Sequence, residues 1–258
     1  MDPCGKGVFL TGGARGIGRG LMEALLSKGA KVMFCDVRVE TGKATEAELQ
    51  QKFGADNVFF RECDVTDSGF GAVDICVNNA GILDESNWEK TIEVNLTAQI
   101  RGSQLALDHM RRDRGGRGGL IINTVSGIVA LSVHFCPVYM ATKHGMIGFM
   151  TSWAKNPKMK DMGVRWRCFC PALTDTDLLK EANDADSGKV EDFNAYQALC
   201  SVEGAVMSVD ETAQEFLKLF QDQDSDDAIF LVRHNGASGY VRRQLVDSDG
   251  VSNIVTVD

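Results

Sequence analysis

One short stretch near the N-terminus constrains the fold more than any other part of the chain. Residues 8–10 form an apolar run typical of a strand buried on both faces, and residues 11–18 form a glycine-rich turn that leads into apolar residues at helical spacing. Such a unit points free backbone N–H groups and the positive end of a helix at one place, which suits phosphate. The alternative is a tight turn that binds nothing. We therefore expect a dinucleotide phosphate to bind at Gly12, Gly13, Ala14, Arg15, Gly16, Ile17 and Gly18.

The rest of the chain alternates strand-like and helix-like segments, which predicts an α/β fold with a doubly wound parallel sheet. In such a fold the first four strands are expected in the order 3-2-1-4. The length of 258 residues suits a single domain over residues 1–258, and 44% of the residues are apolar, enough for a full core. Helices are expected directly after the glycine turn and at residues 40–53, 88–110 and 138–156. About seven strands are expected, at residues 8–10, 31–36, 57–63, 73–77, 120–125, 164–170 and 228–232.

Composition and charge argue against several classes of function. The net charge of −9 makes nucleic acid an unsuitable main partner. No run of 18 apolar residues occurs, so no membrane span is expected, and residues 1–6 do not resemble a secretory signal. The eight cysteines do not have the spacing of a zinc site, so no metal is expected. Reduced thiols suggest the cytoplasm.

Polar residues at the ends of the expected strands are candidates for holding a nucleotide. Asp36 ends the second strand, where an acid in a dinucleotide fold binds the adenosine ribose, although a turn or helix-capping aspartate is the alternative. Asn79 follows the fourth strand and can tie neighbouring strands together, unless it belongs to an ordinary turn. The cofactor-contacting set also includes Val37, Cys63, Asp64 and Val65, with Asp64 placed to bind the adenine amino group.

A second group of polar residues lies in the middle of the chain. Tyr139 and Lys143 are four residues apart, so they share one face of the expected 138–156 helix, and Ser126 follows the fifth strand. Asn95 falls on the same side of the 88–110 helix as Trp88, where an inward polar residue is either structural or part of a site. For Tyr139 and Lys143 alone, an amphipathic surface is the simpler explanation.

Together these motifs resemble the short-chain dehydrogenase/reductase family. The carrying pieces are residues 11–18, Asp36, Asp64, residues 78–81, Asn95, Ser126 and residues 139–143, in the order of that family, and the resemblance covers about residues 5–235. More narrowly, residues 23–32, 87–91 and 137–145 resemble a branch that oxidises hydroxy lipids with NAD. The resemblance implies a Rossmann-type sheet, NAD as the cofactor, and catalytic roles for Asn95, Ser126, Tyr139 and Lys143. It also implies an oligomer, a homodimer being expected and a tetramer the alternative.

The chemistry can also be argued from these residues. Oxidation of a secondary alcohol removes the hydroxyl proton while hydride leaves the carbon, and Tyr139 is the candidate base. Because free tyrosine has a pKa near ~10, Lys143 and the cationic nicotinamide ring are expected to favour the phenolate. Ser126 would bind the substrate oxygen, Lys143 would also hold the nicotinamide ribose, and Asn95 would anchor a water that relays the proton.

The expected substrate is a small apolar, lipid-like alcohol that contacts Ser126, Cys136 and Tyr139. Cys136 replaces a glutamine of the hydroxy-lipid branch, which makes the pocket more apolar. Residues 171–203 form a natural lid, and Thr174, Asp175 and Thr176 should meet the nicotinamide amide, although Ala172 stands where the family has glycine. The alternatives are a dehydrogenase of another apolar alcohol or ketone, or a weakly active NAD-binding protein.

Cofactor choice and assembly are further expectations. Asp36 would repel the 2′-phosphate of NADP, which favours NAD, whereas Arg15 and Arg38 point the other way. Small residues at Ala141, Gly145, Gly148 and Ser152 form a stripe that, with the 88–110 helix, is the expected subunit interface.

The connection between the third and fourth strands departs from the family pattern. Only residues 65–72 are available, whereas parallel strands normally need a dozen or more connecting residues, usually a helix. We therefore expect that helix to be missing or reduced, with low stability and an exposed part of the sheet, or else the chain is a truncated isoform. The acidic tail at residues 247–258 is expected to be solvated surface.

Overall fold

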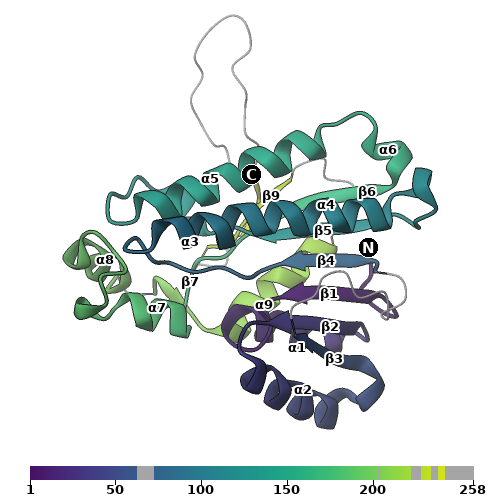
Figure 1. Ribbon diagram of the computed structural model, residues 1–258, viewed down its shortest axis with the longest axis horizontal. Helices are drawn as coiled ribbons and strands as arrows, with labels where there is room; N and C mark the ends of the chain where they lie inside the picture. Colours follow the sequence, from purple (N-terminus) through teal and green to yellow (C-terminus); the bar gives the residue numbers. More distant parts are fainter. Residues whose placement is uncertain (63–72, 203, 222–227, 234–237, 242–258) are drawn as a thin grey trace, which may run out of the picture.

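The computed structural model describes residues 1–62, 73–202, 204–221, 228–233 and 238–241. Its centre is an eight-stranded sheet with the order β10-β9-β6-β5-β4-β1-β2-β3 (Figure 1). The strands are β1 (Gly7–Thr11), β2 (Lys31–Asp36), β3 (Val58–Glu62), β4 (Ile75–Asn78), β5 (Gly119–Thr124), β6 (Val164–Cys170), β9 (Ile229–Leu231) and β10 (Gly239–Val241). The expected order of the first four strands, 3-2-1-4, is confirmed.

The sheet differs from the prediction at one edge. β10 pairs with β9 in the antiparallel direction, Tyr240 opposite Phe230, so this eighth strand was missed. A separate two-stranded parallel sheet joins β7 (Leu173–Thr174) to β8 (Val206–Met207). Each of these additional strands has only two or three residues, too few for an alternating pattern to show in a sequence.

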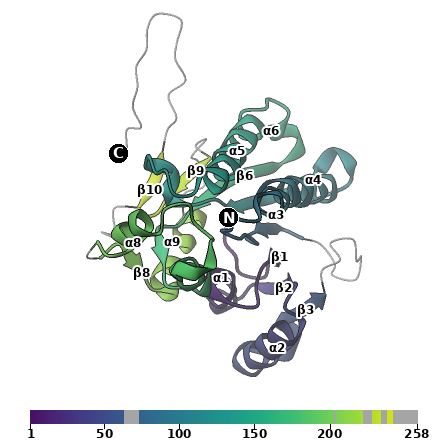
Figure 2. The same cartoon turned by 60° about the vertical axis from the view of Figure 1, so that its left-hand side comes forward.

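Helices cover both faces of the sheet, as Figures 1 and 2 show. A hydrophobic core lies on each face of the sheet, and alternate residues of β5 point into one or the other. Leu120 and Ile122 pack on the side of α1 and α9, whereas Ile121 packs on the side of α4 and α5. The helices are α1 (Gly16–Ser27), α2 (Val39–Phe53), α3 (Trp88–Ile92), α4 (Gln99–Met110), α5 (Pro137–Ala154), α6 (Met159–Met162), α7 (Asp177–Ala182), α8 (Phe193–Cys200) and α9 (Val209–Leu217).

The expected helix over residues 88–110 is interrupted by a π-helical stretch, η2 (Glu93–Ala98), between α3 and α4. Because a π-helical turn holds more residues than an α-helical turn, residues before it are rotated relative to those after it. Trp88, expected on the buried side, is 48% exposed, and that expectation was wrong. Asn95, within η2, is fully buried.

Buried amides hold α4 close to the centre of the sheet. Nδ2 of Asn78 on β4 donates to Oγ of Ser103 on α4 at 3.0 Å and to Oδ1 of Asn123 on β5 at 3.3 Å. A Cβ placed on Gly102 would lie 2.5 Å from Oδ1 of Asn78, so only glycine allows this approach. The polar contacts fix the register of the two strands that lead toward the site.

The segment between β6 and α9 lies beyond the ends of the central strands, at the left of Figure 1. Thr176 caps the N-terminus of α7, and Asp192 caps that of α8 through the N–H of Ala195 at 3.0 Å. The expectations for residues 65–72, for Cys63, Asp64 and Val65, and for the tail at residues 247–258 lie outside the described residues. No helix within the described ranges is long and apolar enough to cross a membrane.

Candidate active site

The glycine turn between β1 and α1 packs against the end of β4. Gly12 has a φ of 71°, and a Cβ there would lie 2.9 Å from Cα of Ala80. A Cβ on Gly18 would lie 2.0 Å from the carbonyl oxygen of Gly12. Nδ2 of Asn79 donates to the carbonyl oxygens of Thr11 and Gly12, both at 3.2 Å, so its expected bridging contact is confirmed.

Several backbone N–H groups of the turn already donate hydrogen bonds within the protein. Those of Gly12 and Gly13 donate to the carbonyl oxygen of Cys35, and that of Ala14 donates to Oδ2 of Asp36 at 3.0 Å. The first half of the turn therefore offers no free N–H to a phosphate. From Arg15 to Gly18, the described residues supply no acceptor for the four backbone N–H groups, which leaves these groups free to bind an anion.

Asp36 connects the end of β2 to the glycine turn. Besides the bond from Ala14, its carboxylate accepts a hydrogen bond from the N–H of Arg38 at 2.9 Å, and the residue is 8% exposed. This is the structural arrangement of a turn aspartate. Its neighbour Val37 is 83% exposed at the same strand end. A ribose contact by Asp36 stays a prediction.

Tyr139, Ser126 and Lys143 come together where β5 ends and α5 begins. Ser126 interacts with the hydroxyl of Tyr139 and acts to lower the pKa of that phenol. Lys143 is 3% exposed, and its Nζ donates to the carbonyl oxygen of Thr124 at 3.1 Å and lies 5.3 Å from the centroid of the Tyr139 ring. Helical spacing and the strand end thus bring the three expected residues to one place.

Burial is the main influence on the pKa values of Tyr139 and Lys143. It raises the pKa of Tyr139 to about 12, against the opposing effect of the Ser126 hydrogen bond. It also lowers the pKa of Lys143 to about 8. Desolvation of the phenolate is the largest effect on the Tyr139 pKa. The expectation that Lys143 and the cationic nicotinamide ring together favour the phenolate stays a prediction.

The side chain of Asn95 is hydrogen-bonded to the backbone near Tyr139 and Lys143. Its Oδ1 accepts from the N–H of Ile82 at 2.8 Å, and its Nδ2 donates to the carbonyl oxygen of Ile82 at 2.7 Å. A Cβ on Gly81 would lie 3.3 Å from Oδ1 of Asn95 and 3.6 Å from Nζ of Lys143, so both groups border Gly81. The contacts support the structural role of Asn95, and its water relay stays a prediction.

Cys136 lies in an apolar cluster over Tyr139. Burial and the charge of Glu85 raise the pKa of the Cys136 thiol to about 12, so the thiol is neutral and adds to the apolar character of the cluster. The buried members are Leu83, Ile128, Phe135, Cys136, Tyr139, Ala182 and Tyr196. The last two belong to α7 and α8, so the segment after β6 packs onto the expected substrate side.

Of the three residues expected to meet the nicotinamide, only Thr176 is seen beside the glycine turn. A Cβ on Gly16 would lie 3.4 Å from Cγ2 of Thr176. The hydroxyl of Thr174 instead donates to the carbonyl oxygen of Ala172 at 2.9 Å and lies 3.0 Å from the hydroxyl of Thr212. Asp175 is exposed and pairs with Lys180 at 3.0 Å.

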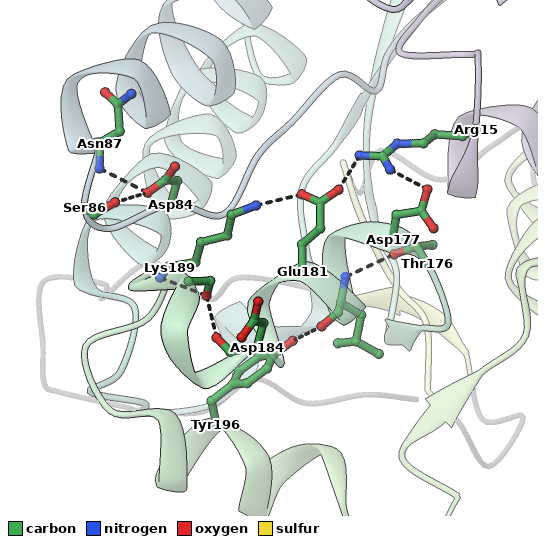
Figure 3. Close-up of polar contacts among 12 residues, drawn as sticks. Arg15, Asp84, Ser86, Asn87, Thr176, Asp177, Glu181, Asp184, Lys189 and Tyr196 are labelled. Carbon is green, nitrogen blue, oxygen red and sulfur yellow. Dashed lines mark hydrogen bonds and ion pairs between the residues drawn. The ribbon is translucent and has the colours of Figure 1, made fainter. Parts of the chain in front are cut away.

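Ion pairs tie the glycine turn to α7, as Figure 3 shows. Arg15 pairs with Asp177 and, at 2.8 Å, with Glu181, and Glu181 also pairs with Lys189 at 2.7 Å. The two cations lower the pKa of Glu181 to about 2. Sequence reasoning missed these partners of Arg15. The spacing of four between Asp177 and Glu181 put them on one helix face, but nothing local linked that face to residue 15.

Comparisons with known proteins agree with this arrangement. The family model described as short chain dehydrogenase matches residues 6–187. The 15-hydroxyprostaglandin dehydrogenases [NAD(+)] of Bos taurus and Homo sapiens are each 42% identical over 192 residues, which cover 70% of this chain and 72% of each relative. The 3-oxoacyl-[acyl-carrier-protein] reductase FabG of Chlamydia pneumoniae is 32% identical over 200 residues, 70% of this chain and 78% of that protein.

A solved structure supports the fold. The short chain dehydrogenase/reductase from Burkholderia phymatum, in complex with NAD, superimposes with a TM-score of 0.70 at 20% identity, covering 86% of this chain and 87% of that one. The finer resemblance noted in the sequence, to an NAD-dependent hydroxy-lipid branch, agrees with the two mammalian relatives. This chain belongs to the short-chain dehydrogenase family.

Proposed function

We propose that this protein, an NAD-dependent oxidoreductase of the short-chain dehydrogenase family, oxidises a secondary alcohol of an apolar, lipid-like substrate to the ketone. The observation that carries the proposal is the cluster of Ser126, Tyr139 and Lys143 beneath apolar side chains at the end of β5. The 42% identity to 15-hydroxyprostaglandin dehydrogenases supports a hydroxy-lipid as the substrate class.

Each residue of the cluster has a defined task in this proposal. Ser126 binds the substrate oxygen, and Tyr139 takes the hydroxyl proton as general base. Lys143, held by the carbonyl oxygen of Thr124, supplies positive charge beside the phenol and holds the nicotinamide ribose. Asn95 anchors a water next to Lys143 across Gly81. Bound NAD+ supplies the hydride acceptor and a positive charge.

The residues near the turn fit NAD better than NADP. The buried carboxylate of Asp36 would oppose a 2′-phosphate, and Arg15 is engaged by two carboxylates rather than free to bind one. The free N–H groups at the start of α1 suit the pyrophosphate, with Gly16, Ile17 and Gly18 as the donors. Thr176 above Gly16 closes this side of the proposed site.

The lid and the subunit contact are part of the proposal. Residues 171–203 act as the lid, supported by the packing of Ala182 and Tyr196 on the side of Tyr139. A homodimer through α5 is also part of the proposal: Gly148 and Ser152 of the small-residue stripe line a hollow of about 350 Å³ there, together with Phe149, Trp153 and Asn156. The described cysteines are free, which favours a reducing compartment such as the cytoplasm.

The test is NADH fluorescence with a panel of alcohols. Long-chain hydroxy-lipids, prostaglandins among them, should be oxidised with a higher kcat/KM than sugars or short polyols, because the cluster offers apolar contacts. A preference for polar polyols would overturn the substrate class. NAD binding without turnover of any alcohol would favour the weakly active binding protein instead.

A further inference from the structure

We propose that Glu85 is a positioning residue for the reaction, because its carboxylate fixes the backbone of Tyr139 at the start of α5. The inference rests on the proposed function and adds a residue that the chemistry alone does not suggest. Glu85 touches no reacting atom in this scheme. It acts through the main chain of the residue that is expected to take the proton.

The first backbone N–H groups of α5 have no hydrogen-bond acceptor within the helix. A helix leaves its first N–H groups without internal acceptors, and a side chain at the N-cap usually takes one or more of them. Here the N-cap is Cys136, which makes no side-chain capping bond, and Pro137 follows with no N–H to satisfy. The N–H of Met140 reaches the carbonyl oxygen of Cys136 at 2.9 Å. Only the N–H groups of Val138 and Tyr139 are left.

Glu85 supplies one oxygen to each of these two groups. Oε2 accepts from the N–H of Val138 and Oε1 accepts from the N–H of Tyr139, both at 2.9 Å. The donors and the carboxylate are 53 and 54 residues apart in the sequence, so this cap is provided by a different part of the fold. Every N–H of the first helical turn thereby finds an acceptor.

The carboxylate is also placed where its charge is favoured. Glu85 is 6% exposed, and no ion pair with it is found among the described residues. Its electrostatic partner is instead the positive end of α5, which stabilises a carboxylate within the first turn. A buried charge held only by two backbone N–H groups keeps those groups in a narrow range of positions, because moving them would leave the charge unsolvated.

Glu85 is itself held from two sides. Its N–H donates to the carbonyl oxygen of Lys189 at 3.1 Å, which joins it to the proposed lid. Its neighbour Asp84 accepts from the hydroxyl of Ser86 at 2.7 Å and from the N–H of Asn87 at 3.1 Å, contacts visible in Figure 3. The backbone that carries the Glu85 carboxylate is therefore held in place on both sides.

The consequence concerns the Tyr139 ring. Its hydroxyl interacts with Ser126, which acts to lower its pKa, and its ring centroid lies 5.3 Å from Nζ of Lys143, while its backbone N–H donates to Glu85. Removing the backbone contact frees the first turn of α5 and shifts the phenol relative to Ser126. A misplacement of about 1 Å at a reacting group costs on the order of 100-fold in rate.

The test compares Glu85→Gln with Glu89→Gln, which makes the same change of charge at an exposed position four residues later. Glutamine keeps one acceptor oxygen but turns an NH₂ group toward the second N–H. With circular dichroism showing folded protein, Glu85→Gln should lower kcat by about 10- to 100-fold, with the Kd for NAD within about twofold of the parent value. Glu89→Gln should leave both unchanged.

Amide hydrogen exchange of the peptide spanning residues 137–143 gives a readout that does not depend on turnover. Exchange at Val138 and Tyr139 should be faster in Glu85→Gln and unchanged in Glu89→Gln. If the parent protein oxidises no alcohol, the proposed function fails, whereas the exchange result still decides whether Glu85 holds the helix.

Unchanged kcat in folded Glu85→Gln, or unchanged exchange at these two amides, would overturn the positioning role. A fall in thermal stability with kcat preserved would show that Glu85 is only structural. Should Glu85→Gln not fold, Glu85→Asp keeps the charge on a shorter side chain. Glu85→Asp is expected to lower kcat with NAD binding retained. An unchanged kcat in this variant would also contradict the proposal.

Discussion

Nζ of Lys143 lies 5.3 Å from the centroid of the Tyr139 ring, with both side chains buried on the same face of α5. Burial raises the pKa of Tyr139 to about 12 and lowers that of Lys143 to about 8. In the protein alone, burial therefore opposes the charged form of both groups: the phenol of Tyr139 stays protonated at neutral pH, and the amine of Lys143 keeps its charge only below about pH 8. Under the proposed function, the positive charge of NAD+ supplies the bias toward the phenolate.

The first prediction is that Tyr139→Phe abolishes turnover while NAD binding is retained. The change removes the proton acceptor and little volume, and a general base contributes about 10²- to 10⁴-fold. Stopped-flow NADH fluorescence and NAD titration measure the two effects. Tyr240→Phe is the matched control, since Tyr240 lies on β10 and its hydroxyl donates to the carbonyl oxygen of Leu219. Retained activity in Tyr139→Phe would place the base elsewhere.

The second prediction concerns stability against pH. Burial lowers the pKa of Lys143 from 10.5 to about 8, so between these values the unfolded chain binds more protons than the folded protein. The free energy of unfolding should therefore rise with pH in this window. Below it, the charged amine costs the folded state roughly 3 kcal/mol. The rise should be lost in Lys143→Met.

Urea unfolding between about pH 7 and about pH 9.5 checks this, with exposed Lys158→Met as the control. Above pH 10 the sign reverses for Tyr139, because its pKa is raised from 10 to about 12 and the folded state holds the proton that the unfolded chain loses. An equal rise in Lys143→Met and in the parent would contradict the assignment to Lys143.

The third prediction is that freeing Arg15 improves NADP binding. Asp177→Asn combined with Glu181→Gln removes both carboxylates that pair with Arg15. A released guanidinium can bind a phosphate, so the Kd for NADP should tighten by about fivefold relative to that for NAD. Asp175→Asn, which breaks only the surface pair with Lys180, should leave the ratio unchanged. A ratio unaltered by the double variant would show that Arg15 does not reach the 2′ position.

The fourth prediction tests the proposed homodimer. Gly148 borders the hollow on α5, and a Cβ there would meet no atom within 4 Å, so Gly148→Arg should fold normally. If two copies meet at this face, the arginine should shift the protein to a monomer in sedimentation velocity. Gln51→Arg, exposed on α2 on the other face of the sheet, should have no effect. A parent protein that is monomeric at high concentration would refute the interface.

Features encoded by local pattern could be predicted from the sequence. The glycine turn and the shared face of Tyr139 and Lys143 depend on spacing over a few residues, and the structure has them as expected. The order of the first four strands followed from the fold class that the alternating pattern predicts. Contacts between distant segments could not be predicted. Arg15 and Glu181 are 166 residues apart, and Glu85 and Tyr139 are 54 apart, with no periodicity that links them. The raised pKa of Tyr139 depends on burial by α7 and α8, which only the packed fold creates.

The π-helical stretch from Glu93 to Ala98 has a consequence for how this gene can change. Each residue of an α-helix turns the chain by about 100°, so an insertion or deletion within the stretch would rotate α3 relative to α4. Asn95 would then lose its hydrogen bonds to the Ile82 peptide, and Ser103 on α4 would no longer face Asn78 of the sheet. Length variation should be tolerated in the exposed loop after α4 and selected against here. Among natural variants, a frame-preserving deletion of one codon in this stretch should be a loss-of-function allele.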